Sequence, residues 1–250
     1  GENKINFTPP GNLGLVYNYK LWKGINQGYP FFSFYEYMNS EVFHPKINFV
    51  YCVISDITPT FINKIKSDIT AILIIGNISG HMTEQRSFFV ELINKNIYNP
   101  VIINRTYDND ISSDQLKISG SIDVGSLLCD GLGDGIMFSS SKNLSPPHLN
   151  SLAFSILQST RNRISKTEYI SCPSCGRTLF DLQETTEKIR NATSHLKGLK
   201  IGIMGCIVNG PGEMADADYG YVGSGKDKIT LYKVHEIIKK NVPTINALDE

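Results

Sequence analysis

The sequence predicts an α/β protein with two domains. Over about 46–158, short apolar runs suited to buried parallel strands alternate with helix-length segments. After Lys166 this pattern gives way to shorter strands and cysteine-containing loops. A chain of 250 residues is long enough for one large domain or two small ones, each with its own core. We therefore expect an α/β domain over 1–165 and a smaller α+β domain over 166–250.

The first domain opens with an aromatic segment and continues as alternating strands and helices. Residues 1–42 show no clean periodicity and are predicted to be an irregular lead-in that packs on the rest of the domain. The apolar run over 47–54 predicts a buried strand. Thr58 is placed to cap a helix through about residue 67, and Ala71–Ile75 predicts a second buried strand.

The alternation continues to about residue 158. The further expected elements are a helix capped by Thr83, strands over Val101–Asn104 and Gly135–Phe138, a weak helix over 121–129, and a helix over 147–158 begun by Pro146 and Pro147. Strands that alternate with helices imply right-handed crossovers and a parallel sheet. The predicted sheet is open or partly barrel-like.

The second domain is expected to place two cysteine loops directly after strands. Its predicted elements are strands over Glu168–Ser171 and Leu199–Met204 with a helix over Asp181–Leu196 between them, a hairpin of Ile229–Tyr232 and Val234–Lys239, and the start of a helix over 245–250. The helix and strand predicted between Cys175 and Cys206 are long enough to bring the third cysteine back beside the C-x2-C pair.

Composition excludes several classes of partner. Lys plus Arg and Asp plus Glu number 24 each, so the formal net charge is zero. We therefore expect no nucleic-acid partner and no attraction to an anionic membrane. No apolar run approaches the roughly 20 residues that a membrane span needs. Cys52 and Cys129 lie in apolar strings and are expected to be buried. Five cysteines in a chain of this length do not suggest a disulfide framework, which favours a reducing compartment.

Three other cysteines and a glutamate form the most informative pattern. Cys172 and Cys175 have C-x2-C spacing, and Cys206 and Glu213 flank the Asn209-Gly210-Pro211-Gly212 turn. Three soft thiolates with one harder, displaceable carboxylate indicate an iron–sulfur cluster that keeps one iron open for chemistry. Glycines in these loops let backbone amides approach the sulfur atoms.

Other metal chemistries stay open at this point. C-x2-C alone is often half of a structural zinc site, with His195 or His235 as a possible fourth ligand. A thioredoxin-like dithiol would leave the third cysteine without a role. Arg177 next to the C-x2-C pair is a candidate phosphate partner, although a solvated or ion-paired arginine is the simpler interpretation.

Two long stretches resemble a known enzyme family. The segments 166–184, which contains Ser171-Cys172-Pro173-Ser174-Cys175-Gly176-Arg177-Thr178, and 203–223, which contains Gly205-Cys206-Ile207-Val208-Asn209-Gly210-Pro211-Gly212-Glu213, resemble the cluster-binding domain of the large, plant-type 4-hydroxy-3-methylbut-2-enyl diphosphate synthases. The resemblance is dense over about 120–240. Residues 43–119 resemble, more weakly, the domain inserted in that large form.

The resemblance implies a fold and a set of site residues. It implies a partial, TIM-like parallel α/β insert domain acting as a spacer, followed by an iron–sulfur domain similar to the sulfite/nitrite reductase fold. It implies Cys172, Cys175, Cys206 and Glu213 as ligands of a [4Fe-4S] cluster, and Asn209 as the loop residue that turns toward the substrate.

The resemblance also implies an activity and its partners. The family carries out reductive ring opening and dehydration of 2-C-methyl-D-erythritol 2,4-cyclodiphosphate in the non-mevalonate isoprenoid pathway, with electrons from ferredoxin or flavodoxin. Its substrate is bound by a TIM barrel that we do not find here, so we expect this chain to be inactive without a barrel segment. The implied location is a plastid-like organelle (apicoplast or chloroplast), with the bacterial cytoplasm as the alternative. The competing functions are a cluster-bearing electron-transfer module and a zinc-binding interaction domain.

Overall fold

The chain divides into two compact units, which are described separately. A computed structural model describes residues 11–247 except positions 12, 26 and 179 and the segments 77–81, 108–110 and 141–144. The units are Gly1–Thr160 and Arg161–Glu250. This division lies a few residues before the domain boundary that the sequence predicts.

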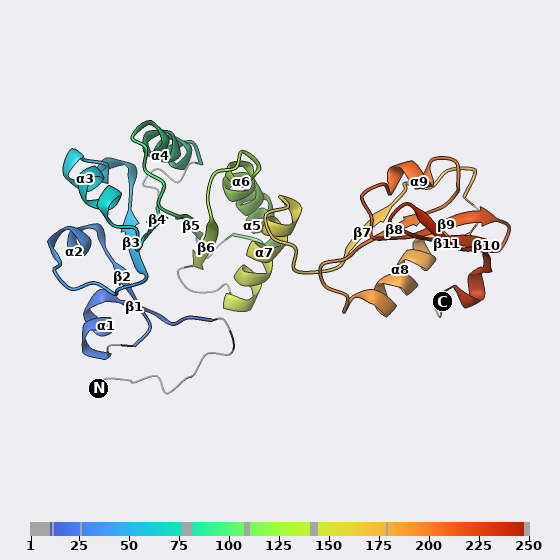
Figure 1. Cartoon of the computed structure of the whole chain (residues 1–250), viewed down its shortest axis with the longest axis horizontal. Coiled ribbons are helices and arrows are strands. Elements are labelled where there is room, and N and C mark those ends of the chain that lie inside the picture. The colour runs from blue at the N-terminus through green and yellow to red at the C-terminus, as the bar shows by residue number, and fades with distance from the viewer. Residues whose placement is uncertain are drawn as a thin grey trace. The chain divides into compact units, whose positions relative to one another are not determined.

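Unit 1 is built on a curled, six-stranded, all-parallel sheet (Figure 1). The strands are β1 (Val16–Asn18), β2 (Tyr29–Phe32), β3 (Asn48–Cys52), β4 (Ala71–Ile75), β5 (Val101–Tyr107) and β6 (Gly135–Ser140). Their spatial order equals their order in the chain. Right-handed crossovers in such a sheet all turn the same way, so the helices cover one face, as they do in a TIM-like barrel. The predicted partial, TIM-like α/β fold is confirmed.

The helices of unit 1 follow the outer side of the curled sheet (Figure 1). They are α1 (Tyr19–Ile25), α2 (Phe34–Asn39), the short 3₁₀ helix η1 (Ile54–Asp56), α3 (Pro59–Ser67), α4 (Met82–Asn94), α5 (Ser113–Gly120), the π-helical η2 (Ser121–Gly125), α6 (Ser126–Cys129) and α7 (Pro146–Ser159). The core lies between these helices and the sheet, where alternate residues of β3, such as Val50 and Cys52, meet Phe61 and Ile65 of α3. Thr58 caps α3 as predicted, with its Oγ1 accepting from the Phe61 N–H at 3.3 Å.

Several sequence predictions for unit 1 are wrong. Part of the expected irregular lead-in is two strand–helix units, β1–α1 and β2–α2, whose strands were too short to show a period of two. Thr83 lies inside α4 and does not cap it. Residues 113–120 form a helix that the sequence did not reveal. Cys52 is buried as expected, but Cys129 is exposed at the end of α6.

Unit 2 is a five-stranded mixed sheet, with its longest helix on one face and a short helix on the other (Figure 1). Its strands are β7 (Glu168–Ser171), β8 (Lys200–Met204), β9 (Tyr219–Gly225), β10 (Lys228–Lys233) and β11 (Glu236–Pro243), and its helices are α8 (Leu182–Thr193), α9 (Gly210–Glu213) and the 3₁₀ helix η3 (Thr244–Asn246). β7, β8 and β9 are parallel neighbours, and β10 is antiparallel to both β9 and β11. The predicted α+β unit is confirmed.

Two small cores hold the helices of unit 2 against opposite faces of the sheet. Leu182 and Ile189 of α8 pack with Ile203 and Tyr221 on one face. Met214, directly after α9, packs with Met204 and other residues on the opposite face. The partly buried Cys172 contacts both cores, because it leaves the end of β7 between them.

Some elements of unit 2 differ from prediction. The central strand β9 was not expected, since its Gly-rich sequence argues against a strand. The Asn-Gly-Pro-Gly segment forms the short helix α9 and not only a turn. The helix expected over 245–250 begins as η3, and residues 248–250 lie outside the described part of the chain.

Candidate functional site

Both cysteine loops leave the same edge of the unit 2 sheet. β7 and β8 pair in parallel with Ser171 opposite Ile203, so their carboxyl ends stop side by side. Cys172 follows β7 directly, and Cys206 lies two positions after the end of β8. The Gly205 N–H donates to Cys172 Sγ over 3.3 Å, which joins the two loops. A backbone amide aimed at a thiolate stabilises its negative charge.

Thr178 holds the C-x2-C loop in shape. Its Oγ1 accepts from the Cys175 N–H at 3.1 Å and from the Ser174 hydroxyl at 3.0 Å. The Thr178 N–H in turn donates to the Cys175 carbonyl oxygen at 2.9 Å. Ser174 has φ +68°, a left-handed conformation that is uncommon for a residue other than glycine. The loop is therefore tightly wound, and it presents Cys175 at the surface.

The second loop returns to the cysteines through α9. The Asn209 carbonyl oxygen accepts from the N–H groups of Gly212 and Glu213, both at 3.0 Å. The Asn209 side chain makes no capping hydrogen bond, so it is available to the cavity beside it. Gly210 is needed where the loop crosses β8, because a Cβ there would stand 2.8 Å from the Met204 Cβ.

Met214 anchors the loop that carries Glu213. It is only 2% exposed. Gly202 of β8 and Gly220 of β9 are register partners. A Cβ would stand 2.6 Å from Met214 Cβ at Gly202 and 2.3 Å from Met214 Sδ at Gly220. Two paired glycines therefore form a notch for this one side chain. This anchor was not predicted from the sequence, although glycines inside strands signal a close approach of another group.

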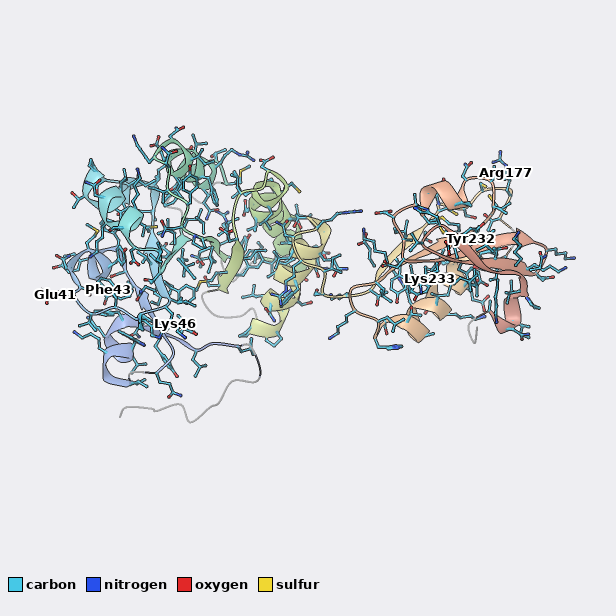
Figure 2. All side chains as sticks on the ribbon, viewed as in Figure 1. Glu41, Phe43, Lys46, Arg177, Tyr232 and Lys233 are labelled. Atoms are coloured by element: carbon cyan, nitrogen blue, oxygen red, sulfur yellow. The ribbon has the colours of Figure 1, made fainter. Side chains whose placement is uncertain are left out.

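All five predicted site residues line one cavity of about 150 Å³. Its lining contains Cys172, Cys175, Cys206, Asn209 and Glu213, together with Pro173, Ser174, Met204 and Gly210. His195 and His235, the alternative zinc ligands, do not line it. Arg177 is exposed, and its side chain points away from the unit (Figure 2). Tyr232, also labelled there, belongs to the small core around Met214.

The chemistry of the donor set fits an iron–sulfur cluster. Within the part of the chain that the structure describes, no three His, Cys, Asp or Glu side chains converge closely enough to hold one metal ion. Thiolates are the usual ligands of iron–sulfur clusters, and the cavity offers three cysteines and one carboxylate.

Fold and site together define an α+β domain with a cysteine-lined cavity, preceded by a curled parallel α/β unit. Residues 168–250 match the family described as GcpE protein C-terminal domain. The chain is 43% identical, over 97% of its own length and 39% of the relative's, to the 4-hydroxy-3-methylbut-2-en-1-yl diphosphate synthase (flavodoxin) of Bacteroides fragilis. Proteins of the same name from Porphyromonas gingivalis and Leptospira interrogans are 56% and 54% identical over 60% and 58% of this chain, and 26% and 21% of theirs.

The resemblance seen in the sequence is therefore confirmed. The chain is similar over almost its whole length to a 4-hydroxy-3-methylbut-2-en-1-yl diphosphate synthase (flavodoxin), and residues 168–250 of unit 2 match the GcpE protein C-terminal domain. It spans about 39% of the length of the Bacteroides fragilis relative. The described residues contain no helix that is long and apolar enough to cross a bilayer.

Proposed function

We propose that this chain is the cluster-carrying part of an iron–sulfur oxidoreductase of the non-mevalonate isoprenoid pathway. The observation that supports this most directly is the one cavity lined by three cysteines, Asn209 and Glu213. A relative named 4-hydroxy-3-methylbut-2-en-1-yl diphosphate synthase (flavodoxin) matches 97% of the chain. The reaction proposed for the complete protein is the reductive ring opening of 2-C-methyl-D-erythritol 2,4-cyclodiphosphate with loss of water.

Each of the five predicted site residues that line the cavity has a proposed part in that chemistry. Cys172, Cys175 and Cys206 would hold a [4Fe-4S] cluster, and Glu213 would be its exchangeable oxygen ligand. When bound, the cluster would supply electrons and a Lewis-acidic iron. The side-chain amide of Asn209, which makes no capping hydrogen bond to α9, would orient the substrate. The exposed positions of Asn209 and Glu213 leave this side of the cavity accessible to a substrate held elsewhere in the complete protein.

The proposed donor is flavodoxin, which the names of the relatives contain. The proposed compartment is one that keeps thiols reduced. The relatives named above are bacterial, which supports the bacterial cytoplasm over the plastid-like organelle that the sequence suggested.

Metal analysis of the anaerobically purified chain tests this proposal. We expect about four iron and four acid-labile sulfide per chain, with visible absorbance that bleaches on reduction or in air. About one zinc and no sulfide would instead identify a structural metal site. In that case the redox function would be wrong for this chain.

Glu213→Cys separates the enzyme from a pure electron carrier. A fourth thiolate would close the site, so we expect this variant to retain about four iron per chain. When the chain is combined with a barrel segment, turnover should be lost, because a thiolate is a poorer leaving ligand for a substrate oxygen than a carboxylate. Glu213→Gln is the matched control, since it retains an oxygen ligand without its charge. Full turnover in Glu213→Cys would contradict the ligand assignment.

A further inference from the structure

A second and larger hollow adjoins the C-x2-C loop on the opposite side of the sheet. This groove, of about 870 Å³, is lined by the 171–175 loop and by residues of α8 or the segment before it: Thr178, Phe180, Asp181, Leu182, Gln183, Thr186, Glu187 and Arg190. Its volume is typical of binding sites, which measure roughly 300–1,000 Å³. Cys172, Pro173, Ser174 and Cys175 line both the groove and the cysteine-lined cavity. The C-x2-C loop is therefore a thin wall between the two hollows.

The two hollows face different ways. The cavity contains Asn209 and Glu213 of the α9 loop, on the sheet face where Met214 is buried. The groove lies along α8, whose Leu182 and Ile189 pack on the other face. The substrate must approach the exchangeable ligand, Glu213. An electron donor that has to act while substrate is bound therefore needs another approach, and the groove provides one.

The charges of the groove do not suit a diphosphate. Its ionisable lining residues, apart from the two cysteines, are Asp181, Glu187 and Arg190. The carboxylate of Asp181 caps α8 by accepting from the Glu184 N–H at 2.8 Å. The Arg190 guanidinium lies over the Tyr169 ring, 5.2 Å from its centre. Sites for phosphate groups gather several cations, whereas this groove has two carboxylates and one cation.

The C-x2-C loop itself is exposed, so another protein can contact it. Pro173, Ser174 and Cys175 are all exposed, and hydrogen bonds to Thr178 hold Ser174 and Cys175 in place. Electron-transfer proteins associate through small, transient interfaces, for which a rigid, exposed loop beside the redox centre is sufficient. Burial of the edge of a flat cofactor in the groove would bring it next to Cys172 and Cys175, two of the proposed ligands.

We propose that flavodoxin docks in this groove and reduces the cluster through the Cys172–Cys175 loop. This inference rests on the proposed function. In each encounter the reduced flavin loses one electron and the cluster gains one, and no bond is made or broken. The substrate and the donor then use opposite sides of the same loop.

Filling the groove with an exposed tryptophan tests the proposal. Gln183 lines the groove and is exposed, so Gln183→Trp should block docking without changing the core. Lys188→Trp is the matched control on the same helix, because Lys188 is exposed and does not line the groove. The full chain is loaded with its cluster, and its reduction is followed by stopped-flow absorbance with reduced flavodoxin or with dithionite. Reduced ferredoxin is measured in parallel as an alternative donor.

We expect Gln183→Trp to slow reduction by flavodoxin about tenfold or more, which corresponds to about 1.4 kcal/mol. Its reduction by dithionite, its iron and sulfide content and its visible spectrum should equal those of the unchanged chain, and Lys188→Trp should behave normally with both reductants. Glu187→Trp, at another exposed position of the groove, repeats the test if Gln183→Trp fails to fold.

Three results would overturn the inference. Normal reduction of both groove variants by flavodoxin would show that it docks elsewhere. Equal slowing with flavodoxin and dithionite would show a change in the cluster and not in docking. If the groove variants slow reduction by ferredoxin but not reduction by flavodoxin, flavodoxin is not the protein that docks in the groove. An unchanged chain that binds no iron or sulfide would instead overturn the proposed function itself.

Discussion

Replacement of Cys206 by serine is expected to abolish cluster binding. Cys206 is partly buried, and among the described residues that line the cavity it supplies the one thiol outside the C-x2-C loop. A serine hydroxyl is a hard ligand that stays protonated at neutral pH, so it cannot replace a soft thiolate. Iron and sulfide in the anaerobically purified chain should fall from about four each to near background. Metal analysis and visible absorbance measure this directly.

Cys129→Ser is the matched control for that substitution. Cys129 is an exposed cysteine of unit 1, outside the cavity, and its replacement should leave both iron and sulfide content unchanged. Far-UV circular dichroism of both variants checks that the fold is intact. A Cys206→Ser protein that retains its full iron and sulfide would show that the third thiolate has been assigned wrongly.

Gly202→Ala is expected to destabilise unit 2 and to impair the site from a distance. The new methyl group would stand 2.6 Å from Met214 Cβ, an atom fixed to the backbone that cannot rotate away. Overpacking of this kind costs about 1–3 kcal/mol. Met214 directly follows Glu213, so its displacement should also shift the carboxylate. Calorimetry of the iron-free chain should show a lower free energy of unfolding, and the loaded chain should contain less iron.

Gly220→Ala provides the comparison within the same notch. There the added methyl group would meet Met214 Sδ and Cε, atoms near the flexible end of the side chain that can move aside. We therefore expect a smaller loss of stability than in Gly202→Ala. In a Met214→Ala background, Gly220→Ala should cost less than it does alone, because that background removes Sδ and Cε, the atoms that the added methyl group meets. If the losses in free energy of unfolding of the two single variants simply add in the double variant, Met214 does not pack against this glycine as described.

The elements that could be predicted each carry a strong pattern within a short stretch of sequence. Ala71–Ile75 and Glu168–Ser171 were predicted with the bounds that the structure shows. An apolar run or a strand-forming segment before a turn is sufficient for such predictions. The capping of α3 by Thr58 and the start of α7 at its prolines were also predictable, since helix starts depend on a few neighbouring residues.

The elements that could not be predicted owe their form to partners distant in the chain. β9 has three glycines among its seven residues, which weaken a strand signal, yet it lies between β8 and β10 and pairs with both. β1 and β2 contain three and four residues, too few for a periodic pattern. Pairing with neighbouring strands determines such segments, and propensity alone does not reveal it.

For the candidate site, residue types and spacing were enough to identify the groups proposed to carry the chemistry: three thiols, one carboxylate and one amide, in loops rich in glycine and proline. These are local properties, so they can be found without a structure. The folded chain was needed to see that the parallel pairing of β7 with β8 brings both loops to one cavity. It was also needed to see that Met214 seats the Glu213 loop in a glycine notch, and that the C-x2-C loop separates the cavity from a groove. These features depend on contacts between segments far apart in the chain, which no local pattern encodes.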